Sequence, residues 1–306
     1  MCRFSVVVPL LGPMDRFEDT LASILRHRPA DTQIIVVHNG SYHDPYQLDG
    51  EVKFIRADED SGLISQLNIG LCYAAGEFTV FVRPGVELDE NWEYGFHALQ
   101  DDNVAAVVPI LVSPKRPTRL VSAGVKINGF GTRRLVGSGR RTSQRSIRSL
   151  QPIGPTLWLA AYRTAVIKAI APLDESLDES FLDADIALSL LSLGLKSVLS
   201  AEFVGQIEDA DWMIDEATIP HGKSAQRTVR RHGGGRSGGL FAAVANDLVA
   251  SIVSPWRLKH LVQRFTVGKS LEKDKRFAER LKILCNDKPW ESKSTDSKSA
   301  EYRRAA

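Results

Sequence analysis

Carboxylate side chains gather between Asp174 and Asp185, where the sequence reads DESLDESFLDAD. A well-placed carboxylate can accept a proton and serve as a general base. Aspartates at the start of a helix also bind its first N–H groups, and the helix-compatible segment Ala184–Leu193 follows these acids. From residue types alone, helix capping is therefore the more frequent role for them.

A cation stands where a buried strand is expected to end. Phe78–Val82 is a short apolar run rich in β-branched and aromatic residues, which is typical of a buried strand. The sequence Arg83-Pro84-Gly85 stops that strand, because proline lacks the N–H of the ladder and glycine permits a sharp turn. Ligands of open α/β sheets bind beyond the carboxyl ends of the strands, so Arg83 is expected at the mouth of a site. The alternative is that Arg83 is a solvated turn residue.

Strands and helices are expected to alternate through the first half of the chain. The predicted strands are Phe4–Val8, Gln33–Val37, Val52–Arg56, Phe78–Val82 and Val104–Pro109. The predicted helices are Arg16–Arg28, Leu63–Ala75 (with Gly76 as its C-terminal cap) and Asn91–Asp101. This order predicts an α/β fold with a mostly parallel sheet flanked by helices. Further on, Leu157–Ile170 and Ala184–Leu193 are helix-compatible, and Leu195–Leu199 reads as a strand.

The composition is that of an ordinary soluble globular protein. The 306 residues are 43% hydrophobic and 25% charged, with a net charge of +2. Three cysteines without paired spacing argue for a reducing compartment and against a zinc site or a disulfide framework. No signal peptide or membrane-spanning segment is recognised, so we expect a cytoplasmic protein that touches a membrane at most from one side.

Several motifs together resemble a known family. They are SVVVP, IIVVHNGS, SGLISQLNIGLCYAAGEFTVFV, PLDESL and FLDADIALSLLSLG, and they cover about residues 3–207. In this order and spacing they resemble the family 2 glycosyltransferases. The resemblance implies a GT-A (Rossmann-like) fold and a nucleotide-diphosphate sugar as donor.

The resemblance also assigns candidate site residues. It implies that Asp183 is the catalytic base and that Asp185, at the spacing of the family's second aspartate, lies at the donor. Pro9, Asn39 and Ser41 match donor-binding positions at the ends of the first two strands. His38 replaces the aspartate usual before Asn39 and is interpreted as a hydrogen-bonded strand-end residue. An arginine usual further along the last helix is replaced by Ser189.

The chain departs from the family at the metal-binding Asp-x-Asp motif, which should fall at Arg83-Pro84-Gly85. Neither Arg83 nor Gly85 offers the oxygen ligands that a hard cation prefers. The family's metal-binding histidine has its nearest match at Gln206. We therefore expect no divalent metal cofactor, and Arg83 as a donor-binding residue in its place. Glu87 and Asp89 are a minor alternative as metal ligands.

A segment without acids lies in the middle of the chain. Asn103–Leu173 contains no Asp or Glu but twelve Lys or Arg residues. Such a block is either a solvated face or an anion site for diphosphate, lipid phosphate or another polyanion. Its glycines favour hairpins or a lid over a helix. The candidates for phosphate binding are Arg133, Arg134, Arg140 and Arg141.

Three regions are expected: a GT-A-like domain at 1–207, a basic helical extension at 208–285 and a disordered tail at 286–306. Trp256–Val267 mixes apolar and basic residues as an amphipathic helix does. It can lie on an anionic membrane or pack against the catalytic domain, and the sequence leaves both open.

The leading interpretation is an inverting glycosyltransferase, independent of metal, with a saccharide or lipid-linked acceptor. The alternative is a catalytically silent GT-A-like module that binds nucleotide sugar or glycan, or scaffolds glycan assembly. Nucleic-acid binding is the weakest hypothesis, because the arginine-rich middle lacks an aromatic platform.

Overall fold

The computed structural model describes residues 2–40, 42–127, 133–208, 224, 227, 231–232 and 271–290. Ser41 and the segments Leu240–Val253 and Trp256–Val267 lie outside the described residues, so the predictions made for them are not tested.

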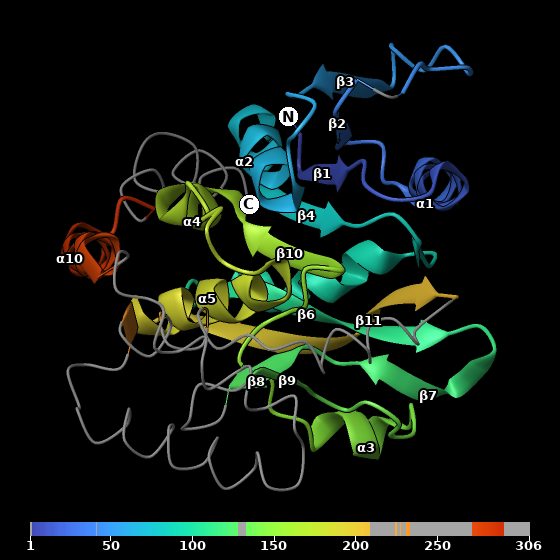
Figure 1. Cartoon of the computed structure of the whole chain (residues 1–306). Helices are drawn as coiled ribbons and strands as arrows, with labels where there is room; N and C mark the ends of the chain where they lie inside the picture. Colours follow the sequence, from blue (N-terminus) through green and yellow to red (C-terminus); the bar gives the residue numbers. More distant parts are fainter. Residues whose placement is uncertain are drawn as a thin grey trace, which may run out of the picture.

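The described part of the chain is built around a sheet with strand order β3-β2-β1-β4-β10-β6-β11-β5, and β7 adds to β6 (Figure 1). The strands are β1 (Phe4–Pro9), β2 (Thr32–His38), β3 (Val52–Arg56), β4 (Phe78–Val82), β5 (Val86–Leu88), β6 (Val104–Ser113), β7 (Arg116–Ser122), β10 (Leu159–Arg163) and β11 (Lys196–Ile207). Strands β1 to β4 are parallel to one another, whereas β10 runs antiparallel between β4 and β6. Strands β1 and β4 are buried along their whole length, which explains their unbroken apolar sequence.

Helices cover both faces of the sheet and create two apolar cores. On one face, α1 (Met14–His27) and the 3₁₀ helix η1 (Trp92–Gln100) pack against alternate strand residues such as Phe4 and Val6. The other face carries α2 (Leu63–Tyr73), α4 (Thr164–Ile170) and α5 (Glu179–Ser192). Helix α10 (Leu271–Asp287) joins this second core through side chains that include Leu281 (Figure 1).

This architecture confirms the predicted α/β fold class with flanking helices, and two local predictions were wrong. Leu157–Ile170 contains strand β10 before helix α4, because pairing with β4 and β6 decides the state of an apolar run that suits either element. Gly76 does not cap α2, which ends at Tyr73. A Cβ on Gly76 would lie 2.7 Å from the backbone carbon of Phe4, so close packing requires this glycine.

The acid-free segment forms hairpins, as its glycines indicate. Strand β7 pairs with β6, and β8 (Val125–Ile127) pairs with β9 (Arg133–Leu135) in a separate two-stranded sheet. The short helix α3 (Gln144–Arg148) follows, and Ile147 anchors it in a small apolar cluster with Leu120. Together, β7 to β9 and α3 form an appendage below β6 in Figure 1.

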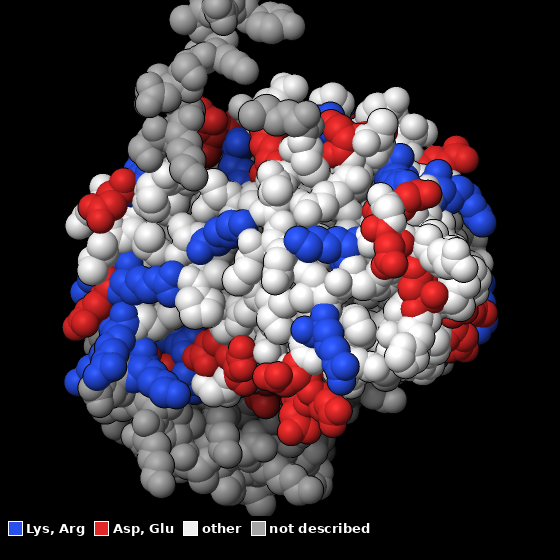
Figure 2. Space-filling view, turned by 90° about the horizontal axis from the view of Figure 1, so that it is seen from above, with Lys and Arg blue, Asp and Glu red and all other residues white. Residues whose placement is uncertain are grey.

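The C-terminal part adds α10, which reaches Asp287, two residues into the predicted tail. In the described part of the chain, no helix is both long and apolar enough to cross a membrane. The net charge of the chain is only +2. On the face shown in Figure 2, basic and acidic side chains are interspersed.

Candidate active site

Three predicted donor-binding residues lie at one edge of the sheet. Pro9 is the last residue of β1, Asn39 directly follows β2, and Arg83 directly follows β4. These strands are parallel neighbours, so their carboxyl ends share an edge. The structure therefore brings Pro9, Asn39 and Arg83 to the edge where open α/β sheets bind ligands.

The turn after β2 is stabilised by His38. Its Nδ1 accepts a hydrogen bond from the N–H of Gly40 at 3.2 Å. Gly40 has φ of +91°, and a Cβ there would lie 3.0 Å from Nε of Arg56. Burial lowers the pKa of His38, and the nearby charges of Arg56 and His43 lower it further. His38 thus holds the turn as a neutral strand-end residue, which is the role that the sequence predicts.

Arg83 is held against an aromatic ring. Its guanidinium carbon lies 3.9 Å from the centre of the Trp158 ring, at cation–π distance. Its backbone N–H also donates to the carbonyl of Trp158 at 3.0 Å. Nη2 of Arg83 lies 3.8 Å from Oε2 of Glu179 in the first turn of α5. Arg83 is therefore a positioned cation with a side chain only 15% exposed, and the solvated-turn alternative does not fit its surroundings.

The positions of the metal motif do not fit a divalent cation. Arg83 is itself a cation, and the N–H of Gly85 is used to donate to Oγ1 of Thr20 at 2.9 Å. Nε2 of Gln206 donates to Oδ1 of Asp89 at 2.6 Å, so the amide and this carboxylate are bound to each other. Over the residues that the structure describes, no group of three or more His, Cys, Asp or Glu side chains could hold a metal ion.

The proposed base, Asp183, is bound by Arg133. Nε of Arg133 donates to Oδ1 at 2.9 Å and Nη2 donates to Oδ2 at 2.6 Å, which is the paired geometry of a guanidinium on a carboxylate. The side chains are 6% and 2% exposed for Arg133 and Asp183. Asp183 lies inside α5 and is not a helix cap. Both of its oxygens are engaged, so it can take a proton from a substrate only after Arg133 moves.

A buried tyrosine lies near this pair. The Tyr162 hydroxyl on β10 is buried without a hydrogen-bond partner among the described residues. Burial raises the pKa of Tyr162, and the negative charge of Asp183 raises it further. Tyr162 therefore stays neutral beneath α5.

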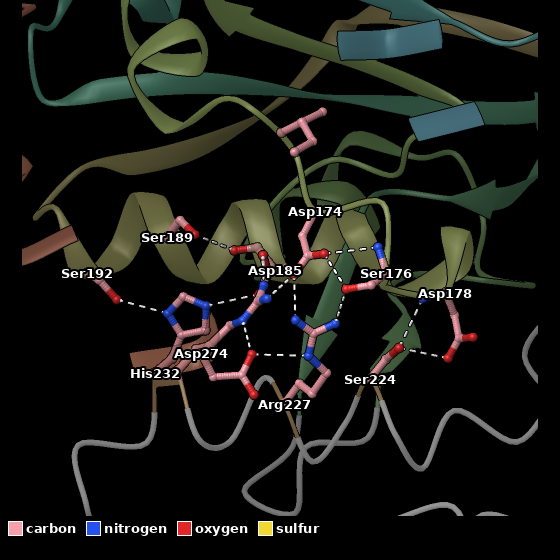
Figure 3. Close-up of polar contacts among 12 residues, drawn as sticks. Asp174, Ser176, Asp178, Asp185, Ser189, Ser192, Ser224, Arg227, His232 and Asp274 are labelled. Carbon is pink, nitrogen blue, oxygen red and sulfur yellow. Dashed lines mark hydrogen bonds and ion pairs between the residues drawn. The ribbon is translucent and has the colours of Figure 1, made fainter. Parts of the chain in front are cut away.

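Asp185, which the resemblance assigns to the donor, is buried in an ionic network (Figure 3). Its Oδ2 lies 3.1 Å from Nη1 of Arg231, and its Oδ1 lies 3.3 Å from Nε2 of His232. Ser189, at the position of the family's helix arginine, donates to the backbone carbonyl of Asp185 at 2.7 Å. The guanidinium on Asp185 thus comes from Arg231, far along the chain.

The network joins α5 to α10. Arg231 also binds Asp174, and its Nε lies 2.8 Å from Oδ1 of Asp274 in α10. Arg227 binds the same two aspartates: its Nη2 lies 2.6 Å from Oδ2 of Asp174, and its Nε lies 3.1 Å from Oδ1 of Asp274. Figure 3 shows the guanidinium of Arg227 in contact with both Asp174 and Asp274. Burial alone would raise the pKa of Asp174, but hydrogen bonds from Ser176 and Arg231 outweigh it and hold that pKa well below its usual range. The network anchors the C-terminal extension on the α/β domain.

The remaining phosphate-binding candidates lie on the hairpin appendage. Arg134 is the cross-strand partner of Lys126 in the β8–β9 pair. Nη1 of Arg140 donates to Oγ of Ser149 at 3.3 Å. Arg141 forms an isolated antiparallel bridge with Arg119. All three arginines are exposed, unlike Arg133.

The first part of the chain matches the model of a known protein family. The model described as Glycosyl transferase family 2 matches residues 5–144. The match covers a little under half of the chain and shows that this region resembles the family. The family 2 region contains β1 to β9 and the Arg83 turn, whereas Asp183 and the ionic network follow it in sequence. No curated protein sequence matches the chain.

Solved glycosyltransferase structures share the GT-A fold with this protein. One is a crystal structure of GalNAc-T7 with UDP, GalNAc and Mn²⁺, at 16% identity and a TM-score of 0.59. That match covers 85% of this chain and 54% of the other, so this chain spans about half the length of the GalNAc-T7 chain. Another is the mannosyltransferase PcManGT from Pyrobaculum calidifontis with GDP-Man and Mn²⁺, at 15% identity and a TM-score of 0.52, covering 94% of this chain and 87% of that one. The family match and the fold support a glycosyltransferase, the enzyme class that the sequence predicts.

Proposed function

We propose that this protein transfers a sugar from a nucleotide-diphosphate sugar to a saccharide or lipid-linked acceptor, with inversion and without a divalent metal. The observation that carries the proposal is the positioned guanidinium of Arg83 at the edge of the family 2 sheet, where the family's metal motif would fall. A diphosphate leaving group needs positive charge, and arginine can bind two phosphate oxygens with paired donors.

The contacts of Arg83 suit this role. Trp158 fixes the plane of the guanidinium from one side, which lowers the entropy lost when an anion binds. The distance of 3.8 Å to Glu179 is longer than a hydrogen bond, so a diphosphate with better geometry competes for the same donors. One guanidinium carries less charge than a dication, and Arg133 is the second contributor that we propose.

Asp183 is the base in this proposal. It takes the proton of the acceptor hydroxyl as that oxygen attacks the anomeric carbon and the nucleoside diphosphate leaves. The bidentate pair with Arg133 must first open. Phosphate groups of the donor supply an alternative anion for Arg133, so donor binding and release of the base are coupled.

One observation favours a second function, a catalytically silent module that binds nucleotide sugar or glycan or scaffolds glycan assembly. Asp183 is buried and both its oxygens are bound, as in a structural ion pair. In that case the pair with Arg133 holds α5 on the hairpin appendage and never opens.

Location is part of the same proposal. The three cysteines without paired spacing favour a reducing, cytoplasmic compartment. The basic amphipathic segment Trp256–Val267 would hold the protein on the inner face of a membrane, close to a lipid-linked acceptor.

Calorimetric titration with UDP, GDP and TDP sugars, each with manganese and with EDTA, tests the proposal. We expect one nucleotide class to bind equally under both conditions, and product to form with a suitable acceptor. Binding that requires manganese would overturn metal independence. Binding without any turnover in the wild-type protein, across saccharide and lipid-linked acceptors, would favour the silent module.

A further inference from the structure

A hollow lined by polar residues lies between β7 and the segment that leads into α3. It measures about 490 Å³ and is lined by Thr118, Arg119, Arg141, Thr142 and Ser143. The lining thus consists of two arginines and three hydroxyl residues, with no carboxylate. These residues belong to the appendage and are not the strand-end residues of the candidate active site.

The two arginines lie directly opposite each other. Arg119 and Arg141 are partners in an antiparallel bridge, and the N–H of Thr142 donates to the carbonyl of Thr118 at 3.0 Å. Like charges opposite each other on paired strands repel and destabilise the pairing. A bound anion between them would convert this repulsion into attraction.

Among the described residues, few acids compensate the positive charge of the appendage. Within the part of the chain that the structure describes, no ion pair joins an acid to any of eight exposed cations of the appendage. They are Arg116, Arg119, Lys126, Arg134, Arg140, Arg141, Arg145 and Arg148. Lys126 and Arg134 form a second cross-strand pair of like charges. In contrast, Lys115 lies 3.7 Å from Glu208, and Arg133 binds Asp183.

The donors of the hollow are partly positioned before any ligand arrives. Nη1 of Arg119 donates to the carbonyl of Gly139 at 2.8 Å, which holds the guanidinium over the turn between β9 and Arg141. Oγ1 of Thr142 donates to the carbonyl of Pro117 at 3.3 Å, so its one proton is used there and the hydroxyls of Thr118 and Ser143 are the ones that can donate to a ligand. Two guanidiniums and nearby hydroxyls offer donors in several directions, which suits the tetrahedral oxygens of a phosphate better than a planar carboxylate.

We propose that this hollow is a phosphate-binding site, separate from the donor site, which takes a phosphomonoester or diphosphate group. The bound group is the headgroup of an anionic lipid or a phosphate on a soluble saccharide, and both offer the same oxygens. A role in anchoring a phosphate-bearing acceptor rests on the proposed function, but phosphate binding itself does not.

Titration of the full-length protein with pyrophosphate, followed by calorimetry, tests the site. We expect Arg119→Gln/Arg141→Gln to weaken binding about tenfold or more, the effect of losing a hydrogen bond to a charged group. The matched control Arg116→Gln/Arg145→Gln removes two charges from the same appendage outside the hollow, and it should change the affinity less than about threefold at physiological salt. Equal effects of the two double variants, or no pyrophosphate binding by the wild-type protein, would overturn the proposal.

Three further arms complete the design. Arg141→Lys keeps the charge and should retain most of the affinity, which guards against a loss caused by misfolding. The effect of the double variant should persist in an Arg83→Ala background, so failure of the donor site and failure of this site are distinguishable.

Vesicles of phosphatidylcholine with and without phosphatidic acid distinguish the two sources of the phosphate group. If the ligand is a lipid headgroup, Arg119→Gln/Arg141→Gln should lose vesicle binding; if it is a soluble phosphate, vesicle binding should not change.

Discussion

Arg133 and Asp183 form a two-pronged ion pair between strand β9 and helix α5, with both side chains almost fully buried. The sequence predicts separate roles for these residues, phosphate binding for Arg133 and proton transfer for Asp183. Their contact means that neither role is available until the pair opens. In the proposed enzyme, this pair therefore keeps the candidate active site closed.

Removal of one partner of this pair should destabilise the fold. We expect Arg133→Met to lower the free energy of unfolding by about 3–5 kcal/mol, because it leaves a buried carboxylate without compensation. Arg133→Met/Asp183→Leu should recover most of that loss, since two apolar side chains need no partner. Urea denaturation of the wild-type protein and the two variants measures the loss and its recovery, with Arg148→Met as an exposed control. An Arg133→Met variant as stable as the control would show that the pair is open in solution.

Asp183→Asn tests the base. The amide is nearly isosteric but cannot accept a proton at neutral pH, so we expect turnover to fall by about 10²–10⁴-fold, the usual range for general-base catalysis. Donor affinity, measured by calorimetry, should be retained or rise, because the neutral amide holds Arg133 less tightly and leaves its guanidinium available to the diphosphate. A fully active Asp183→Asn enzyme would reduce Asp183 to a structural partner of Arg133.

The sequence predicts the strands well because a run such as Phe78–Val82 has one stable solution, a buried strand. It fails at Leu157–Ile170, where pairing with distant strands decides the state of the run. At the site, the turn at Arg83 was predictable from Pro84 and Gly85. Its contacts with Trp158 and Glu179 were not, because they join residues far apart in the chain.

Arg231 was also missed, although a signal existed. The resemblance places Ser189 where an arginine is usual, and a lost arginine beside a retained Asp185 calls for a cation from elsewhere. Arg231 supplies it from 46 positions along the chain. The contacts of Asp185 with Arg231 and His232 place this aspartate in the network that holds the C-terminal extension, and its predicted role at the donor stays a prediction.

Membrane contact through Trp256–Val267 is best tested by substitution. Deletion of residues 254–306 would also remove Asp274, which binds Arg227 and Arg231 in the buried network. We expect Arg257→Gln/Lys259→Gln to reduce flotation with anionic vesicles, by about 1 kcal/mol per lost charge. Lys273→Gln/Lys282→Gln removes two charges from α10 and is the control. Unchanged flotation of the first variant would contradict a membrane role for this segment.

Arg83→Ala should weaken binding of the nucleotide-diphosphate donor by about 1.5–3 kcal/mol, the value of a charge-assisted hydrogen bond. EDTA should have no effect on the wild-type affinity. Arg83→Lys keeps the charge without the paired donors, so its donor affinity should fall between those of the wild-type protein and Arg83→Ala. Titration calorimetry measures all three proteins. An affinity unchanged by Arg83→Ala would show that the donor phosphates do not contact this edge of the sheet.

The pH dependence of stability should depend on Asp174. Its pKa is below the ordinary value in the folded protein, mainly because hydrogen bonds from Ser176 and Arg231 overcome the effect of burial. A group of this kind contributes stability above the unfolded pKa of about 4, and the contribution is lost as the pH falls from there toward the folded pKa. Between about pH 5 and pH 3, the free energy of unfolding should therefore decline less steeply in Asp174→Asn than in the wild-type protein. The two slopes should differ by at most the uptake of one proton, which is about 1.4 kcal/mol per pH unit. Urea denaturation across this range measures the slope, and Asp102→Asn, whose side chain is fully exposed, is the control. Parallel curves for the wild-type protein and Asp174→Asn would contradict the ionic network, because an Asp174 bound by Arg227 and Arg231 must take up a proton on acid unfolding.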